Sequence, residues 1–167
     1  MKSHKIQTYY LGSGFIHVSK KPIVVQTVLG SCVSVCLWDK RLHYGGMNHY
    51  LYPYIREKIM ATPVYGNVAI ISLVRMMEEA GCRREDLIAH ILGGAHPADD
   101  PEFDTGERNI KIARKALAHC RIMVASEDTG GFMGRKIVFD TITGHVAVLK
   151  VYNIRSSDWY TDKKGGI

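Results

Sequence analysis

The chain has 167 residues, which is long enough for one domain with a hydrophobic core and short for two. Its composition, 46% hydrophobic and 23% charged, is typical of a globular protein. The 22 Lys and Arg residues outnumber the 16 Asp and Glu residues, which gives a net charge of +6. This excess favours an acidic partner surface, but it is too small and too evenly spread to predict nucleic-acid binding. We expect a single domain over residues 1–167, with its core over about residues 23–151.

The sequence shows no secretory signal and no apolar run long enough to span a membrane. The longest apolar-rich segment, residues 64–77, is interrupted by polar residues. No C-x-x-C pair occurs among the cysteines, so neither a disulfide scaffold nor a standard zinc site is indicated. These cysteines are Cys32, Cys36, Cys82 and Cys120. We therefore predict a cytoplasmic protein with reduced thiols and no membrane insertion.

Segments enriched in β-branched and apolar residues outnumber those with helical periodicity. A strand-like stretch over residues 9–18 is broken by Gly12 and Gly14. Further strands are predicted over residues 22–28, 32–38, 47–52, 87–92, 122–126, 136–140 and 145–151. Residues 141–144 read as a hairpin turn, and the polar segment 156–167 as a frayed tail. The pattern predicts an α+β fold in which helices pack on mostly antiparallel or mixed sheets.

Two segments have the apolar periodicity of amphipathic helices. The first is residues 67–80, which Gly81 is expected to end. The second is residues 106–119, with Thr105 as its expected N-cap. The predicted inward-facing residues are Val68, Ile70, Ile71, Val74 and Met77 in the first helix, and Ile110, Ala113, Ala116 and Leu117 in the second.

Two short motifs carry the candidate chemistry: residues 29–33 (LGSCV) and residues 45–49 (GGMNH). If the strands over residues 32–38 and 47–52 form a hairpin about Lys40 and Arg41, Cys32 lies directly opposite His49. Opposed residues of an antiparallel pair have Cβ atoms about 5 Å apart on the same face. A thiol and an imidazole at that spacing can act as nucleophile and base. A bulge at residues 45–46 would instead turn His49 to the other face.

The turn before Cys32 suits a catalytic role. Gly30 allows a close backbone approach to a substrate, and backbone N–H groups of Gly30, Ser31 and Cys32 can form an oxyanion hole. A thiol beside a protonated His49 is expected to have a lowered pKa.

Other roles for these residues stay open on spacing alone. Cys32 and His49 can simply fill space in a core, as free cysteines often do. A metal site formed by Cys32, Cys36 and His49 lacks a clear fourth ligand. Ser31 is a weaker nucleophile candidate because its side chain should point away from His49. A redox-sensing role for Cys32 and Cys36 is a further alternative.

A set of motifs in a fixed order resembles the CheD family of chemoreceptor glutamine deamidases. After residues 29–33 and 45–49, with Leu51 and Pro53 close behind, come residues 93–95 (GGA), 106–109 (GERN) and 128–136 (DTGGFMGRK). The resemblance covers about residues 23–151. Each motif alone is weak evidence, but the ordered set is specific.

The resemblance implies an enzyme that hydrolyses selected glutamine amides in the cytoplasmic domains of methyl-accepting chemotaxis receptors. The products are glutamate and ammonia, formed through a cysteine thioester, and the reaction contributes to chemotaxis adaptation. Some members also hydrolyse glutamyl methyl esters. The implied fold resembles bacterial toxin deamidases, with β-sheets sandwiched with helices. The implied partner is a CheC-type phosphatase of CheY, and no metal or organic cofactor is implied.

The family's nucleophile falls on Cys32 and its histidine on His49. A third catalytic residue, a threonine upstream of the cysteine, is assigned to Thr27, five residues before Cys32. Gln26 occupies the position six before, where some relatives carry their threonine, so the third assignment stays open between these positions.

A rival function of another class is an interaction protein that stimulates a CheC-like phosphatase with little deamidase activity. The intact Cys32 and His49 argue against it. Around the site, we expect His96 and the loop of residues 128–135 to be candidates for lining it. Arg108 and Asn109 open a helix, where they either cap it or contact substrate.

Overall fold

The structure is a computed structural model that describes residues 5–152 and residue 154, so the predicted frayed tail lies outside the described residues. The α+β class is confirmed. The helices are α1 (Gly66–Glu79) and α2 (Thr105–His119), with short 3₁₀ turns η1 (Lys58–Met60) and η2 (Arg84–Asp86). The strands are β1 (Gln7–Tyr10), β2 (Ile16–Ser19), β3 (Ile23–Leu29), β4 (Val33–Asp39), β5 (Gly45–Asn48), β6 (Leu87–Gly93), β7 (Met123–Thr129), β8 (Gly134–Asp140) and β9 (Val146–Val151).

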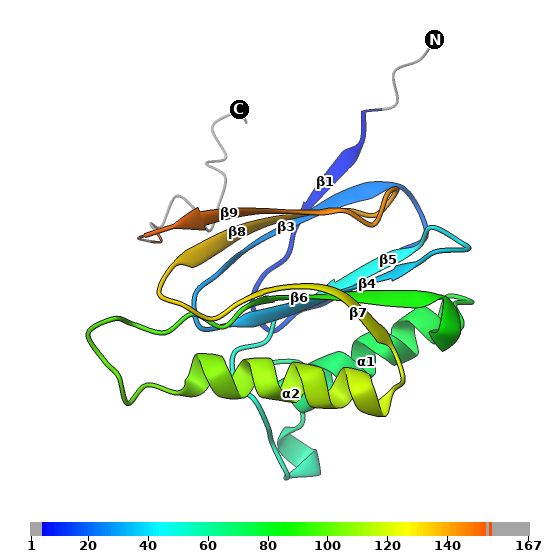
Figure 1. Cartoon of the computed structure of the whole chain (residues 1–167). Coiled ribbons are helices and arrows are strands. Elements are labelled where there is room, and N and C mark those ends of the chain that lie inside the picture. The colour runs from blue at the N-terminus through cyan, green and yellow to red at the C-terminus, as the bar shows by residue number, and fades with distance from the viewer. Residues whose placement is uncertain (1–4, 153, 155–167) are drawn as a thin grey trace, which may run out of the picture.

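The strands form two stacked sheets (Figure 1). One has the order β1-β3-β8-β9 and the other the order β2-β5-β4-β6-β7. β1 runs parallel to β3 and β6 parallel to β7, while the other neighbours are antiparallel, which confirms the expectation of mixed sheets. Both helices cover the outer face of the five-stranded sheet (Figure 1). Neither described helix is long and apolar enough to cross a membrane.

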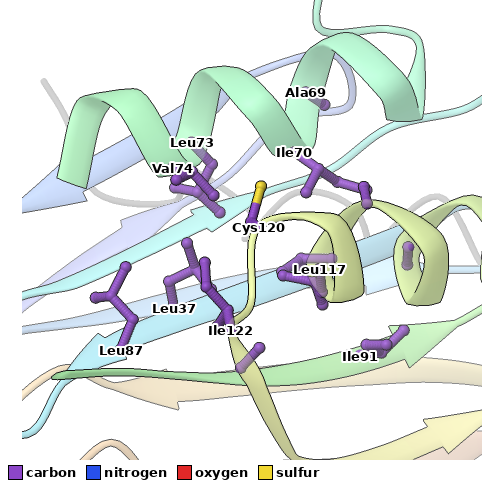
Figure 2. Packing of buried hydrophobic residues seen from close by; sticks show 14 of the residues in the cluster. Leu37, Ala69, Ile70, Leu73, Val74, Leu87, Ile91, Leu117, Cys120 and Ile122 are labelled. Atoms are coloured by element: carbon purple, nitrogen blue, oxygen red, sulfur yellow. The ribbon is translucent and has the colours of Figure 1, made fainter. Parts of the chain in front are cut away.

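The chain has two hydrophobic layers, one on each face of the five-stranded sheet. Figure 2 shows the layer under the helices, where Ile70, Leu73 and Leu117 lie over Leu37 and other sheet residues. The second layer lies between the two sheets and contains Val25, Leu29, Cys36, Met47 and Phe139, with Cys32 packed against it. Because burial of each large aliphatic side chain stabilises the fold by about 1.5–3 kcal/mol, both layers hold the sheets in place.

The two helices follow the predicted ranges closely, with differences at the ends and on one face. Gly81 has φ +106, which ends α1 as predicted. The prediction of Thr105 as the N-cap of α2 was wrong, because Thr105 is the first residue of the helix. The N-cap is Asp104, whose side chain makes no capping hydrogen bond. The inward face predicted for α2 is confirmed. In α1 the buried residues are Gly66, Ala69, Ile70, Leu73, Val74 and Met77, while Val68 and Ile71 are only partly buried.

The hairpin of β4 and β5 forms, but its predicted register was wrong by two residues. Met47, expected opposite Ser34, lies opposite Cys36, and Gly45 lies opposite Trp38. The cause is a wider turn, in which Asp39 Oδ1 accepts hydrogen bonds from the amides of two residues in the turn, at 2.8 and 2.7 Å. Because Val33 pairs with Tyr50, His49 does not lie directly opposite Cys32, so the predicted pairing of these two residues was wrong. A shift of two residues nevertheless keeps every side chain on its predicted face.

Candidate active site

Three predicted site residues lie at the layer between the sheets. Thr27 is on β3, Cys32 immediately precedes β4, and His49 immediately follows β5. Thr27 and His49 are buried, whereas Cys32 is half-buried. A nucleophile needs this combination, because the sulfur must reach substrate while its partners are held away from water.

Thr27 holds the ring of His49. Its Oγ1 lies 2.8 Å from His49 Nδ1, and the same hydroxyl donates its proton to the carbonyl oxygen of Leu11 at 2.8 Å. A threonine hydroxyl has one proton, so its oxygen must accept the hydrogen bond from His49 Nδ1–H. This contact therefore favours the tautomer in which Nε2 has the lone pair that a general base needs.

Gln26 occupies the other position considered for the third catalytic residue. It directly precedes Thr27 on β3 and pairs with Val138 of β8. Side chains alternate along a strand, so Gln26 and Thr27 point to opposite faces of the sheet. Among the described hydrogen bonds it is Thr27 that reaches His49.

The segment around Cys32 is fixed by backbone hydrogen bonds. The amide of Gly94 donates to the Cys32 carbonyl at 2.8 Å, and the amide of Ala95 donates to the Gly30 carbonyl at 3.0 Å. Val33 and Tyr50 exchange two backbone hydrogen bonds, at 3.1 and 3.0 Å. Residues 93–95, the GGA motif, therefore hold the Cys32 segment directly.

Gly93 is required by this close approach. It has φ +105, and a Cβ at this position would collide with the carbonyl oxygen of Cys32. Any other residue would strain the backbone and push the Cys32 segment away.

The expected lowering of the Cys32 pKa is wrong for the protein alone. Burial raises the pKa of the Cys32 thiol to about 11, against a smaller lowering effect of its own backbone N–H. Burial also lowers the pKa of His49 to about 4. Loss of hydration disfavours the charged form of each group, so at neutral pH the pair consists of an uncharged thiol and an uncharged imidazole.

The lowered pKa of His49 predicts a loss of stability in acid. In the unfolded chain an ordinary histidine has a pKa of 6.5, against about 4 for folded His49. Protons therefore bind the unfolded state first as the pH falls below 6.5, and the free energy of unfolding should decrease by up to about 3 kcal/mol by pH 4. Urea unfolding of wild type and His49→Gln at pH values from 7.5 to 4 gives the free energy of unfolding against pH for each protein. The contribution of His49 is the difference between the slopes of these two curves. Parallel slopes would contradict it, because the other histidines are common to both proteins.

A surface cavity of about 280 Å³ opens next to Gly30 and Ser31, the two residues before Cys32. Gly30 and Ser31 line it together with His96 and Phe132, whose rings meet edge to face with their centroids 4.7 Å apart. Its other lining residues are Ala95, Pro97, Phe103, Gly134, Tyr152 and Ile154. Thus His96 and the loop of residues 128–135, both predicted as candidates, contribute to this cavity.

The alternative metal site finds no support among the described residues, where no group of three His, Cys, Asp or Glu side chains lies close enough to hold an ion. Cys36 is fully buried in the layer between the sheets, and burial raises the pKa of its thiol. It therefore behaves as a core residue.

Sequence reasoning missed two partners of the site. The carbonyl of Leu11, which accepts the Thr27 hydroxyl, lies in the connection between β1 and β2, a segment without a motif. Asn109 on α2 hydrogen-bonds the backbone next to Cys32, a contact that its place in the GERN motif did not specify.

Comparisons with known proteins agree on one family. The family model described as CheD chemotactic sensory transduction matches residues 56–150. A protein of Sulfurimonas denitrificans named "Probable chemoreceptor glutamine deamidase CheD" is 44% identical over 82% of this chain and 90% of its own length. A protein of the same name from Trichlorobacter lovleyi is 43% identical over 84% of this chain and 89% of its own length.

A more distant protein of that name, from Methanococcus vannielii, is 35% identical over 86% of this chain and 95% of its own length. Among solved structures, Bacillus licheniformis hypothetical protein YfiH matches 67% of this chain and 49% of its own, with a TM-score of 0.43 and 13% identity. This structural similarity is too weak to support a conclusion about the family or function of the chain.

Proposed function

Because the chain belongs to the CheD family of chemoreceptor glutamine deamidases, we propose that it converts glutamine side chains of chemoreceptors to glutamate with Cys32 as the nucleophile. The observation that supports this proposal is the hydrogen-bonded chain from Leu11 through Thr27 to His49, together with the half-buried thiol of Cys32 immediately before β4. It holds an uncharged imidazole in the tautomer that can accept a proton from Cys32.

The first half of the reaction forms a thioester. As the Cys32 sulfur attacks the carboxamide carbon of the substrate glutamine, His49 Nε2 takes the thiol proton. Because the resting thiol and imidazole are both uncharged, proton transfer accompanies attack and no preformed thiolate is required. The tetrahedral intermediate expels ammonia once the protonated His49 donates a proton to the amide nitrogen, which would otherwise be a very poor leaving group.

The second half releases glutamate. A water molecule, deprotonated by His49 Nε2, attacks the thioester carbon, and the sulfur of Cys32 leaves and regains the proton. Thr27 keeps the ring in place through both halves, because its oxygen can accept the Nδ1–H bond whether the imidazole is neutral or protonated.

Backbone N–H groups next to Cys32 supply the electrostatic stabilisation of the negative charge on the tetrahedral intermediate. The backbone N–H of Cys32 lowers the pKa of its own thiol, and we assign this N–H, with those of Gly30 and Ser31, to the oxyanion hole. Gly30 and Ser31 line the adjacent cavity, which has apolar walls from Phe103 and Phe132. We assign this cavity to the stretch of receptor next to the target glutamine.

The biological setting follows from the family. We place the reaction in the cytoplasm, where new glutamates on receptors serve chemotaxis adaptation, and we include a CheC-type phosphatase of CheY as a protein partner. No metal or organic cofactor enters the proposed reaction.

The proposal is tested with purified protein and the cytoplasmic fragment of a chemoreceptor from the same organism. Ammonia release should depend on both components and should be absent with free glutamine, because a protein surface is needed to fill the cavity. If the receptor fragment releases no ammonia, with or without a CheC-type protein, the proposed activity is wrong.

A further inference from the structure

Asn109 is a buried polar residue that connects the two halves of the site. It lies in the first turns of α2, outside both sheets, and its side chain is fully buried. Its Nδ2 donates one hydrogen bond to the carbonyl of Ser31 at 3.0 Å and another to the carbonyl of Leu51 at 2.9 Å. Ser31 directly precedes Cys32, and Leu51 follows His49 by two residues. One amide group therefore joins the nucleophile segment to the histidine segment.

A second contact reinforces this connection. The Tyr50 hydroxyl donates to the backbone carbonyl of Asn109 at 2.6 Å. Tyr50 is fully buried, directly follows His49, and is paired through its backbone with Val33. Asn109 thus contacts the residue before the nucleophile and the two residues after the histidine.

Stability alone does not explain an asparagine at this position. Its Oδ1 is buried and accepts no hydrogen bond among the described residues. A buried acceptor without a donor destabilises a fold. The two hydrogen bonds from the Asn109 N–H groups are therefore accompanied by the destabilising effect of its unsatisfied oxygen. The two carbonyls that it serves belong to irregular segments, between β3 and β4 and after β5, and neither accepts a backbone hydrogen bond among the described residues, although Val33 and Tyr50 pair next to them.

We propose that Asn109 is a positioning residue that sets the spacing between Cys32 and His49. The inference rests on the proposed function, and it assigns to Asn109 no contact with substrate. Attack by the thiol and proton transfer to the imidazole both depend on that spacing, and a misplacement of about 1 Å can lower a rate by about 10²-fold. Substrate binding depends on the cavity, whose lining residues do not include Asn109. Loss of the two hydrogen bonds should therefore lower kcat and leave KM nearly unchanged.

The test uses two substitutions at Asn109 and a matched control elsewhere. Asn109→Ala removes the amide, and Asn109→Asp keeps the shape but replaces the two N–H donors by a buried carboxyl group, which offers at most one O–H donor. The control is Asn67→Ala on α1, because Asn67 makes the same kind of two-bond contact, accepting from the amide of Ile55 at 3.1 Å and donating to its carbonyl at 2.9 Å. Ile55 belongs to neither catalytic segment.

Both Asn109 variants should lose kcat by about 10- to 100-fold with KM changed less than about threefold, while Asn67→Ala keeps the wild-type kcat. Equal kcat in Asn109→Ala and Asn67→Ala would overturn the inference, as would a rise in KM alone. Retention of wild-type kcat by Asn109→Asp would show that the donors are not needed.

A substrate-free measurement separates this inference from the proposed function. The rate at which iodoacetamide alkylates Cys32, followed by peptide mass spectrometry, reports the surroundings of the thiol without any receptor. It should change several-fold in the two Asn109 variants and remain at the wild-type value in Asn67→Ala, with thermal unfolding confirming that each protein is folded. Unchanged alkylation would overturn the positioning role even if receptor deamidation failed in the wild type. If Asn109→Ala does not fold, the isosteric Asn109→Asp decides.

Discussion

Replacing Cys32 by Ala is expected to abolish receptor deamidation while leaving the fold intact. The substitution removes the atom that forms the thioester in the proposed mechanism, and loss of a catalytic nucleophile lowers kcat by about 10⁴-fold or more. Cys32 is half-buried at the edge of the layer between the sheets, so the free energy of unfolding should change by less than about 1 kcal/mol. Ammonia release from receptor fragments and urea unfolding measure the two effects separately.

Cys36→Ala is the matched control for the nucleophile. Cys36 lies on the same face of the five-stranded sheet, but it is fully buried in the layer between the sheets. Removing its sulfur should destabilise the protein by about 1 kcal/mol and leave ammonia release near the wild-type rate. Equal losses of activity in the two variants would mean that the thiol at position 32 has no special role.

Replacing Thr27 by Val is expected to lower kcat by about 10²-fold with little change in KM. Valine matches the shape of threonine but removes the oxygen that accepts the Nδ1–H bond of His49. Without it the imidazole can turn or exchange its proton to Nε2, the nitrogen that must take the proton of Cys32. A misoriented general base loses most of a contribution that is typically about 10²- to 10⁴-fold. Steady-state kinetics of ammonia release give kcat and KM.

Thr141→Val separates this catalytic effect from the loss of a buried hydroxyl. The Thr141 hydroxyl is likewise buried and bonds to the amide and carbonyl of Ile23, both at 3.0 Å, at the opposite end of β3 from Leu29. Both variants should lose about 1–3 kcal/mol of stability through unsatisfied backbone groups. Only Thr27→Val should lose kcat, and a similar kcat for the two variants would refute the orienting role of Thr27.

The sequence was sufficient to predict the structural features that depend on residues close together in the chain. The enrichment of β3 and β4 in β-branched and apolar residues, the periodicity of α2 and the stop at Gly81 are local properties, and each element was predicted within a residue or two. The motifs around Cys32 and His49 placed these residues next to the ends of β4 and β5 for the same reason. The register error at Trp38 arose because the side chain of Asp39 widens the turn, a contact that strand patterns do not encode.

The features that could not be predicted from the sequence depend on contacts between the two sheets and between the sheets and the helices. Thr27 could not be preferred over Gln26 by spacing, because the choice depends on which face of β3 lies against His49. The pKa of Cys32 was predicted in the wrong direction because the depth of its burial between the sheets was unknown. Asn109 is far from Ser31 and Leu51 in the chain, so only the folded arrangement brings its amide to their carbonyls.

The proposed deamidation of receptor glutamines through Cys32 can be followed at single residues of the substrate. The most direct test is site-resolved mass spectrometry of a receptor cytoplasmic fragment after incubation with wild type or Cys32→Ala. We predict that selected glutamines gain the mass difference between –NH₂ and –OH with wild type, and that none does with the variant. Conversion of the same glutamines by Cys32→Ala, or of none by the wild type, would contradict the account.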